Sequence, residues 1–179
     1  VNSTASGLFI NQMLNNSADR TLAGPPAIDW PGNFSGYLPP VSGDFDGDGH
    51  ADIVSSPPGR DGTYVGFGPD FDPVEAPALG FADGPQSLLV GDVDGDGTSD
   101  LITYRTDGES SEVQVSFGRD GEGPVLDPAP DQAHPADVAS WEAYELLTGD
   151  FDGDGQTDLV WNARGVDNQS FVALAQPLF

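Results

Sequence analysis

One loop of nine residues occurs three times in this chain of 179 residues, and no other feature constrains the fold as strongly. Each copy reads Asp-x-Asp-Gly-Asp-Gly-x-x-Asp, with carboxylates at positions 1, 3, 5 and 9 and glycines at positions 4 and 6. The copies begin at Asp44, Asp92 and Asp150. Their spacing of roughly 50 to 60 residues is typical of propellers and other repeat arrays, so we predict three copies of one structural unit.

The spacing of the acidic residues suits a hard cation. Calcium takes six to eight oxygen ligands, and a tight turn brings the side chains at positions 1, 3 and 5 to a common centre. The two glycines allow the positive φ values that wrap the backbone around that centre. We expect the carbonyl at position 7 to add a ligand and the aspartate at position 9 to close the shell. The predicted ligands of about three calcium ions are Asp44, Asp46, Asp48, His50, Asp52, Asp92, Asp94, Asp96, Thr98, Asp100, Asp150, Asp152, Asp154, Gln156 and Asp158.

Other readings of the loop fit less well. Magnesium prefers to keep several waters, and zinc needs histidine or cysteine ligands that the loops do not offer. An EF-hand needs a bidentate glutamate at position 12, where this chain has Ser55, Thr103 and Trp161. A single copy would also fit a solvated Asp-Gly turn, but three copies with identical spacing favour a metal site.

Apolar runs flank the loops and predict β-strands. Residues 88–90 and 146–147 precede the second and third loops, and residues 100–104 follow the second. A further strand is expected about a dozen residues later, where residues 112–117 alternate strictly between apolar and polar. Residues 64–67 and 170–174 hold the matching places in the other repeats. Proline-rich connections are predicted at 22–31, 69–85 and 124–135, and residues 138–147 are predicted as part loop and part strand.

Charge and composition exclude several classes of function. The chain has 30 acidic residues against five basic ones, a formal net charge of -25. Nucleic acid and anionic membranes require a basic surface, so neither is an expected partner. The chain has no cysteine, which excludes disulfides and thiolate metal sites. No run of 18 apolar residues exists, so membrane insertion is not expected.

Candidates for catalysis are weak, and we predict that the protein is not an enzyme. Glu142 and Glu145 are the best pair for a glycosidase site, yet in so acidic a chain they fit a solvated surface better. His134 lies in a proline-rich connection, which does not suggest catalysis. Three tryptophans could stack on sugars as in a lectin, but core or interblade packing is favoured for them: Trp30, Trp141 and Trp161.

An extracellular or cell-surface location is predicted from two further features. Four Asn-x-Ser/Thr sequons permit glycosylation of an exposed surface. Extracellular calcium is near millimolar, a level at which weak sites fill. The sequons begin at Asn2, Asn15, Asn33 and Asn168.

The repeats resemble a known family. The aspartate loop is followed by Ile-Val or Leu-Ile and then by a strand that ends in Phe-Gly, at residues 67–68 and 117–118. This pattern is similar to FG-GAP/VCBS repeats, the calcium-binding blades of integrin α-subunit propellers and of many bacterial surface proteins and lectins. The resemblance implies an all-β fold of propeller-type blades and a calcium-stabilised structural or adhesive module outside the cell. Alternatives are a carbohydrate-binding lectin-type propeller and a non-catalytic appendage of a larger secreted enzyme.

The predicted organisation is a single repeat domain over residues 1–179. Residues 1–36 form an N-terminal late strand and linker, and the repeats occupy 37–86, 87–143 and 144–179. The smallest ordinary propeller has four blades, so three predict an incomplete ring or a repeat array. We expect either a homo-oligomer or polymer, in which residues 7–14 add a strand to a neighbour, or the remaining blades of a longer chain. A glycan or a surface protein is the expected ligand.

Overall fold

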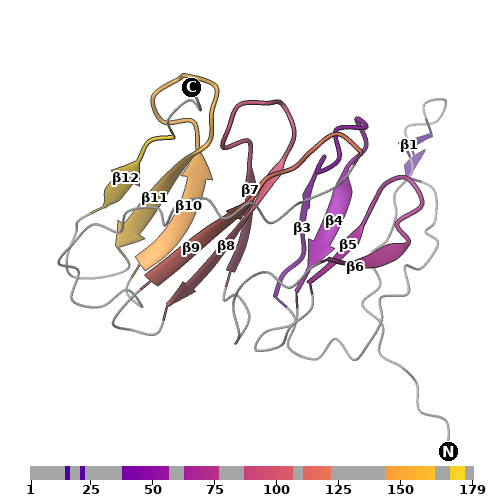
Figure 1. The fold of residues 1–179 in the computed structure, drawn as a ribbon, viewed down its shortest axis with the longest axis horizontal. Helices are drawn as coiled ribbons and strands as arrows, with labels where there is room; N and C mark the ends of the chain where they lie inside the picture. The colour runs from indigo at the N-terminus through magenta and orange to yellow at the C-terminus, as the bar shows by residue number, and fades with distance from the viewer. Residues whose placement is uncertain are drawn as a thin grey trace, which may run out of the picture.

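The computed structural model describes residues 15–16, 21–22, 38–56, 63–76, 87–106, 111–121, 144–163 and 170–175. Within these segments every regular element is a β-strand, which confirms the predicted all-β class. Strands β1 (Asn15–Asn16) and β2 (Thr21–Leu22) form a two-residue ladder. The other strands form three antiparallel sheets that lie side by side (Figure 1).

Each sheet belongs to one repeat, and its strands follow one another in chain order. The first sheet contains β3 (Val41–Gly43), β4 (Asp52–Ser55), β5 (Thr63–Gly66) and β6 (Pro73–Ala76). The second contains β7 (Ser87–Gly91), β8 (Asp100–Thr106) and β9 (Ser111–Ser116). The third contains β10 (Tyr144–Gly149), β11 (Asp158–Ala163) and β12 (Phe171–Ala173).

The three repeats share one register. The glycine before each loop pairs with the aspartate at loop position 9, as Gly43 does with Asp52, so the loop closes a hairpin between the first two strands. The same pairing joins Gly91 to Asp100 and Gly149 to Asp158. The predicted order of strand, loop, strand and late strand is therefore confirmed in every repeat. Residues 138–143 of the mixed loop-and-strand prediction lie outside the described segments, and the rest of it falls in β10.

Strand β6 corrects the prediction that residues 69–85 are only a connection. It pairs with β5 along Thr63–Gly66 and makes the first sheet four-stranded. Its turn is closed by the Phe71 N–H, which donates to the Phe67 carbonyl at 2.8 Å. The strand lies at the sheet edge and begins with Pro73, and proline is tolerated at the first residue of an edge strand. The proline-rich composition therefore hid an edge strand.

The core lies between neighbouring sheets. Between the first and second sheets, Phe45, Val54, Val65 and Leu101 form one buried cluster. Between the second and third, the buried cluster is Ile102, Tyr104, Val113, Val115, Leu146, Leu159 and Trp161. In β8, Leu101 belongs to the first cluster and Ile102 to the second, because successive side chains of a strand point to opposite faces.

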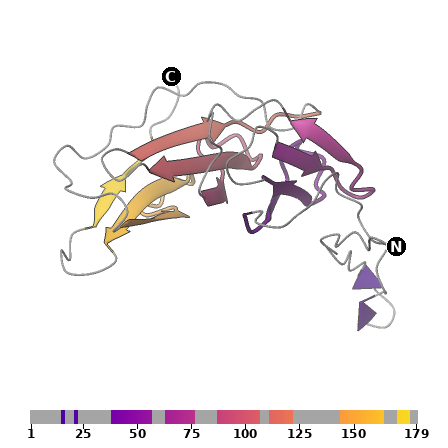
Figure 2. The same cartoon turned by 90° about the horizontal axis from the view of Figure 1, so that it is seen from below.

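The sheets stack in an open row. Strand β3 contacts β7, and β7 contacts β10, so the first strands of successive repeats are neighbours. Figure 2 shows the row from below, and the three described sheets enclose no barrel. This arrangement is that of propeller-type blades that do not complete a ring. None of the described segments forms a helix capable of crossing a membrane.

Candidate metal centre

The three aspartate loops lie at the same end of the stacked sheets (Figure 1). Each joins the first strand of its sheet to the second, so the hairpin pairing fixes both ends of the loop. The glycines at positions 4 and 6 all adopt positive φ, as predicted: Gly47, Gly49, Gly95, Gly97, Gly153 and Gly155 have values between 73° and 93°. A residue with a Cβ is strained in that region, so this turn selects glycine.

Hydrogen bonds within each loop hold the carboxylates in one arrangement. The position 6 N–H donates to the position 1 carboxylate, as from Gly49 to Asp44 at 2.9 Å. The position 7 N–H donates to the position 5 carboxylate, as from His50 to Asp48 at 2.7 Å. The other two loops repeat both bonds, at 3.0 and 3.1 Å and at 2.7 and 2.8 Å. The shape of the loop is thus determined by its own side chains.

Carboxylate oxygens converge in every loop. In each of three groups, one oxygen from each of three aspartates lies within 4.8 Å of the other two. The first two groups use positions 1, 3 and 5, whereas the third uses positions 1, 3 and 9. The groups are Asp44, Asp46 and Asp48; Asp92, Asp94 and Asp96; and Asp150, Asp152 and Asp158.

The position 9 aspartates are buried, with exposed fractions of 0%, 0% and 1% for Asp52, Asp100 and Asp158. In each, Oδ2 accepts the position 2 N–H at 2.6–2.8 Å. Oδ1 accepts an N–H that follows the third strand, from Gly68, Gly118 or Ala175 at 2.7–2.9 Å. This residue therefore ties the loop to the end of the third strand. The two Phe-Gly pairs are the sequence signal of this bond, because their glycines are two of the donors.

Burial makes two of these carboxylates, Asp52 and Asp100, costly to ionise. It raises the pKa of Asp100 to about 6; the Val93 and Gly118 N–H groups oppose that rise, and the neighbouring Asp94 and Asp92 carboxylates add to it. Burial also raises the pKa of Asp52 and of Asp94 above the ordinary value. A divalent cation among the carboxylates would offset both the burial and the mutual repulsion, because an opposite charge favours the ionised form.

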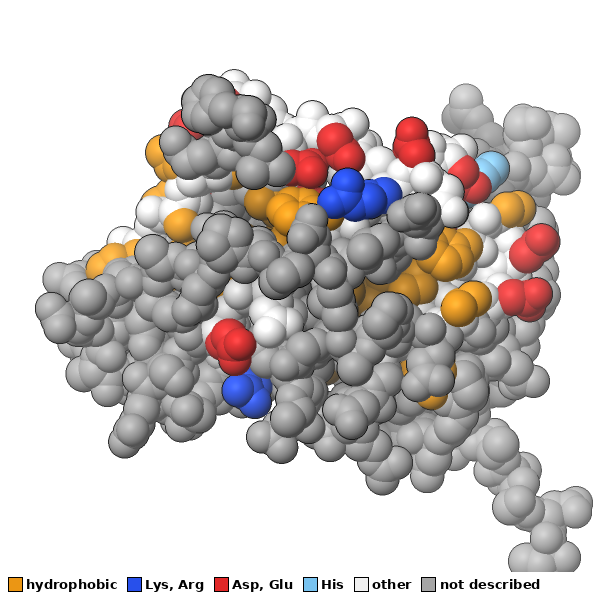
Figure 3. All heavy atoms as spheres, in the orientation of Figure 1, with side chains coloured by type: hydrophobic (Ala, Val, Ile, Leu, Met, Phe, Trp, Pro, Cys, Tyr) orange, Lys and Arg blue, Asp and Glu red, His pale blue; other side chains and the backbone are white. Residues whose placement is uncertain are grey.

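The donor set fits a hard cation. In the first loop, Oδ1 of Asp44 is buried and has no hydrogen-bond partner. A buried acceptor without a partner is costly, and a cation among the three carboxylates would satisfy it. The carboxylates are also open to solvent on one side, since Asp48 and Asp96 are exposed. In Figure 3 acidic side chains lie along the upper edge of the molecule.

The position 7 residues differ between the loops. His50 is exposed and Gln156 is half-buried, whereas Thr98 is buried and its hydroxyl donates to the Asp96 carboxylate. The Gln156 amide donates to Asp154 at 3.3 Å. Whether their carbonyls bind calcium stays a prediction.

Two residues that the sequence did not single out join the loops to each other. The Asp44 N–H donates to the Ser99 hydroxyl at 3.1 Å, and the Ser99 N–H donates back to the Asp44 carbonyl at 2.7 Å. The Asp92 N–H donates to the Thr157 hydroxyl at 3.0 Å, and the Thr157 N–H donates to the Asp92 carbonyl at 2.6 Å. We call this pair of bonds, from position 1 of one loop to position 8 of the next, the clasp. Each metal loop is thereby fixed to its neighbour.

The remaining candidates divide between core and surface. Trp161 is 1% exposed and packs in the second cluster, which confirms interblade packing for this tryptophan. Residues 119–121, an Arg-Asp-Gly sequence, end in a turn. Glu145 is half-buried in β10. The other candidates lie outside the described segments: Trp30, Trp141, His134, Glu142, the predicted strand 7–14, and the sequons at Asn2, Asn33 and Asn168.

Comparison with known proteins agrees with the fold and the loops. Residues 44–103 match the model of the FG-GAP-like repeat, and residues 143–174 match the model of the FG-GAP repeat. Searches of curated proteins and of solved structures gave no significant match. The two matches include all three aspartate loops. This repetitive all-β chain therefore belongs to the FG-GAP repeat family.

The family assignment carries general properties. FG-GAP repeats occur typically in extracellular and adhesion-type proteins, and they are generally structural modules without catalysis. They often bind calcium, and the aspartate groups of this chain are suited to hold a metal.

Proposed function

We propose that this protein is a calcium-stabilised structural or adhesive module of the extracellular space or cell surface, and that it has no catalytic activity of its own. The observation that carries the proposal is the convergence of three carboxylates in each of three loops. Because the loops also join neighbouring sheets, bound calcium would stabilise the whole stack of sheets and not only one turn. The module would present a rigid surface to a surface protein, whereas a glycan ligand belongs to the lectin alternative.

Calcium fits the loops better than other cations. The ligands are carboxylate oxygens supported by backbone donors, and hard cations prefer oxygen. One side of each group stays open, which leaves room for waters and a backbone carbonyl. We propose the aspartates at positions 1, 3, 5 and 9 as ligands, with the position 9 aspartate also acting as the tie to the third strand.

The first experiment measures metal content. After dialysis in millimolar calcium, elemental analysis should give about three equivalents of calcium per chain, one for each loop. The triple variant Asp46→Ala, Asp94→Ala, Asp152→Ala removes the position 3 carboxylate that all three groups share and should bind almost none. Zinc in place of calcium, or no bound metal in the natural chain, would overturn the proposal.

The second experiment separates the structural role from the lectin alternative. On a glycan array, the calcium-loaded protein should bind no sugar more tightly than the triple variant binds it. Trp161, one of three candidates for stacking on a sugar, is committed to the core. A defined sugar bound by the natural chain alone would favour the lectin.

A further inference from the structure

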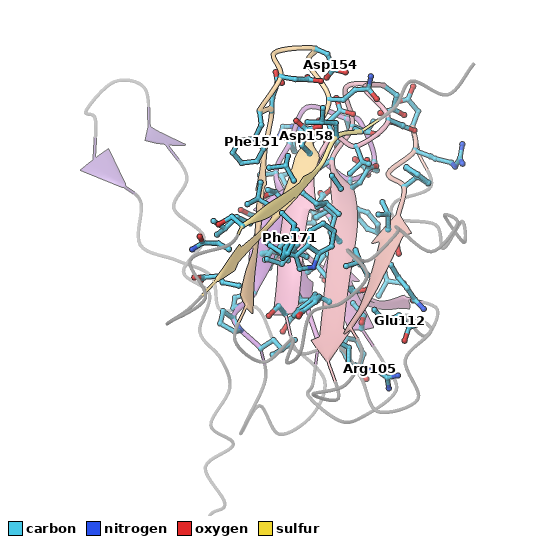
Figure 4. All side chains as sticks on the ribbon, turned by 90° about the vertical axis from the view of Figure 1, so that its left-hand side faces the viewer. Arg105, Glu112, Phe151, Asp154, Asp158 and Phe171 are labelled. Carbon is cyan, nitrogen blue, oxygen red and sulfur yellow. The ribbon has the colours of Figure 1, made fainter. Side chains whose placement is uncertain are left out.

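The outer face of the third sheet exposes apolar side chains. Four of the five large hydrophobic residues that are exposed among the described segments lie on it. Figure 4 looks toward this face, with Phe151 beside the loop. We call this set the third-sheet face: Leu147, Phe151, Val172 and Leu174, with exposed fractions of 40%, 54%, 55% and 44%.

The matching residues in the first two repeats are covered by the next sheet. Val65 and Val115 hold the place of Val172 beside their second strands, and each is only 2% exposed. Phe45 holds the place of Phe151 at loop position 2 and is fully buried. In each of the first two repeats, the next sheet therefore covers the surface that corresponds to the third-sheet face.

The clasp is also open at this end. In the first two loops the backbone of the position 1 aspartate bonds to a serine or threonine of the next loop. Asp150 holds that place in the third loop, and its carboxylate accepts the Gly153 and Gly155 N–H groups within its own loop. No residue among the described segments occupies the clasp position beside the Asp150 backbone.

The glycine before each loop leaves the space into which the clasp residue fits. A Cβ on Gly43 would lie 2.7 Å from the Ser99 side chain, and one on Gly91 would clash with Thr157. None of the three glycines that precede the loops has positive φ. Glycine is needed at these positions because the clasp residue approaches closely, and not because the backbone is unusual. At Gly149 a Cβ would instead lie 3.1 Å from the Phe151 ring. The ring thus lies where a clasp residue would enter.

We infer that the third-sheet face is a docking surface for a further FG-GAP blade, one whose aspartate loop carries serine or threonine at position 8. Such a blade would supply the hydroxyl and N–H that Asp150 needs and would bury the apolar side chains, as the second and third blades do for their neighbours. The inference rests on packing and hydrogen bonds and stands apart from the proposed calcium role.

A second copy of this chain does not fit that description. Ser99 and Thr157 are already engaged in clasps, so a second copy would present its first loop. Position 8 of that loop is Ala51, which is exposed but has no hydroxyl to accept the Asp150 N–H. The clasp therefore gives the stack a direction and distinguishes the partner from the chain itself.

The test uses the full chain with residues 122–179 repeated after Phe179, so that the added blade brings its own copy of Thr157. Since the chain has no cysteine, Val172→Cys in the original third blade gives a unique thiol. In millimolar calcium, a thiol reagent should label it at least about tenfold more slowly in the extended chain than in the 179-residue chain, because labelling would require local opening. Equal rates would overturn the inference.

Matched variants define the mechanism. Thr157→Val in the added copy, or Gly149→Ala in the original third blade, should speed labelling about two- to tenfold relative to the unsubstituted extended chain, whereas Thr157→Ser in the added copy should keep it slow. Val74→Cys, which lies on β6 away from the face and is 54% exposed, should label equally in both chains. Labelling of the Thr157→Val chain as slow as that of the unsubstituted extended chain would refute the role of the hydroxyl.

Two further measurements separate the remaining outcomes. Hydrogen exchange of the Asp150 amide should slow in the extended chain toward that of Asp92, a readout that needs no substitution. If labelling of Val172→Cys in the 179-residue chain slows as protein concentration rises, and mass measurement shows dimers, the occupant is a second copy and the inference is wrong.

Discussion

The first and third loops contain the same seven residues, Gly-Asp-Phe-Asp-Gly-Asp-Gly, at 43–49 and 149–155, yet the structure treats them differently. Phe45 is fully buried and Phe151 is 54% exposed. The Asp44 backbone is clasped by Ser99, whereas Asp150 has no clasp residue among the described segments. The glycines of both loops adopt the same positive-φ turn, so the difference comes from the sheet that follows. The motif determines the conformation of the loop, and the neighbouring sheet determines which of the loop's side chains are buried.

The largest expected difference between the two loops is in the stability that each phenylalanine contributes. Phe45→Ala should lower the free energy of unfolding by about 3–5 kcal/mol, because it leaves a cavity in the first cluster. Phe151→Ala should change it by no more than about 0.5 kcal/mol, because the ring is largely exposed. Urea unfolding in millimolar calcium measures both. Equal losses would show that Phe151 is buried in solution.

The aspartates at loop position 9 should contribute equally to stability in the first and third repeats, because the neighbouring sheet does not change their hydrogen bonds. Asp52→Ala and Asp158→Ala should each cost about 2–4 kcal/mol in chelator, because each leaves two backbone N–H groups without an acceptor. Both side chains are buried, and their bonds stay within one repeat. Asp48→Ala is the exposed control and should lie within about 0.5 kcal/mol of the natural chain. A large gap between the two buried variants would mean that neighbouring sheets contribute to this tie.

Calcium removal should have the next largest effect. For sites with Kd near 10⁻⁴–10⁻³ M, about 1 mM calcium adds roughly 0.4–1.4 kcal/mol per site, or about 1–4 kcal/mol for three. Chelation should therefore lower the melting temperature. A melting temperature indifferent to chelator would contradict a role for calcium in stability.

Single-site variants test whether the position 5 aspartate contributes equally to calcium binding in the first and third loops. Asp48→Ala should weaken calcium binding more than Asp154→Ala, because Asp48 belongs to the converging group of its loop and Asp154 does not. Calorimetric titration of both variants measures the difference. Asp131→Ala, outside every loop in the sequence, is the control and should bind calcium as the natural chain does.

The smallest effect tests the clasp. Ser99→Ala removes the hydroxyl that accepts the Asp44 N–H and should cost about 0.5–1.5 kcal/mol, the usual net value of one hydrogen bond. Ser42→Ala changes an exposed serine on β3 and should be close to neutral. Urea unfolding measures both. Equal effects would show that the clasp hydroxyl does not stabilise the interface.

Much of the fold could be predicted because its signals are local. The alternation at residues 112–117 depends on side chains two residues apart and identified β9. The Asp-Gly spacing identified the loops, since their hydrogen bonds join residues two to seven positions apart. Strand β6 escaped prediction because prolines near its start suggested a connection, and only its place at a sheet edge makes Pro73 acceptable.

The site was predicted in part for a related reason. The convergence of positions 1, 3 and 5 in the first two loops follows from a turn within one segment. The second role of Asp100, as acceptor for the Gly118 N–H, depends on the return of the third strand 18 residues later. The third loop groups Asp158 with Asp150 and Asp152, a difference that the shared motif does not encode.

The sequence by itself determined the repeat, the turn geometry of the loops and the acidic ligand set, because neighbouring residues specify backbone shape and local chemistry. The tertiary structure decided which face of each sheet is buried and which loops are joined. Those features depend on atoms far apart in the chain, as in the clasps between Asp44 and Ser99, 55 residues apart, and between Asp92 and Thr157, 65 residues apart. Identical heptapeptides around Phe45 and Phe151 therefore differ in burial, because burial is a property of the neighbour that covers them.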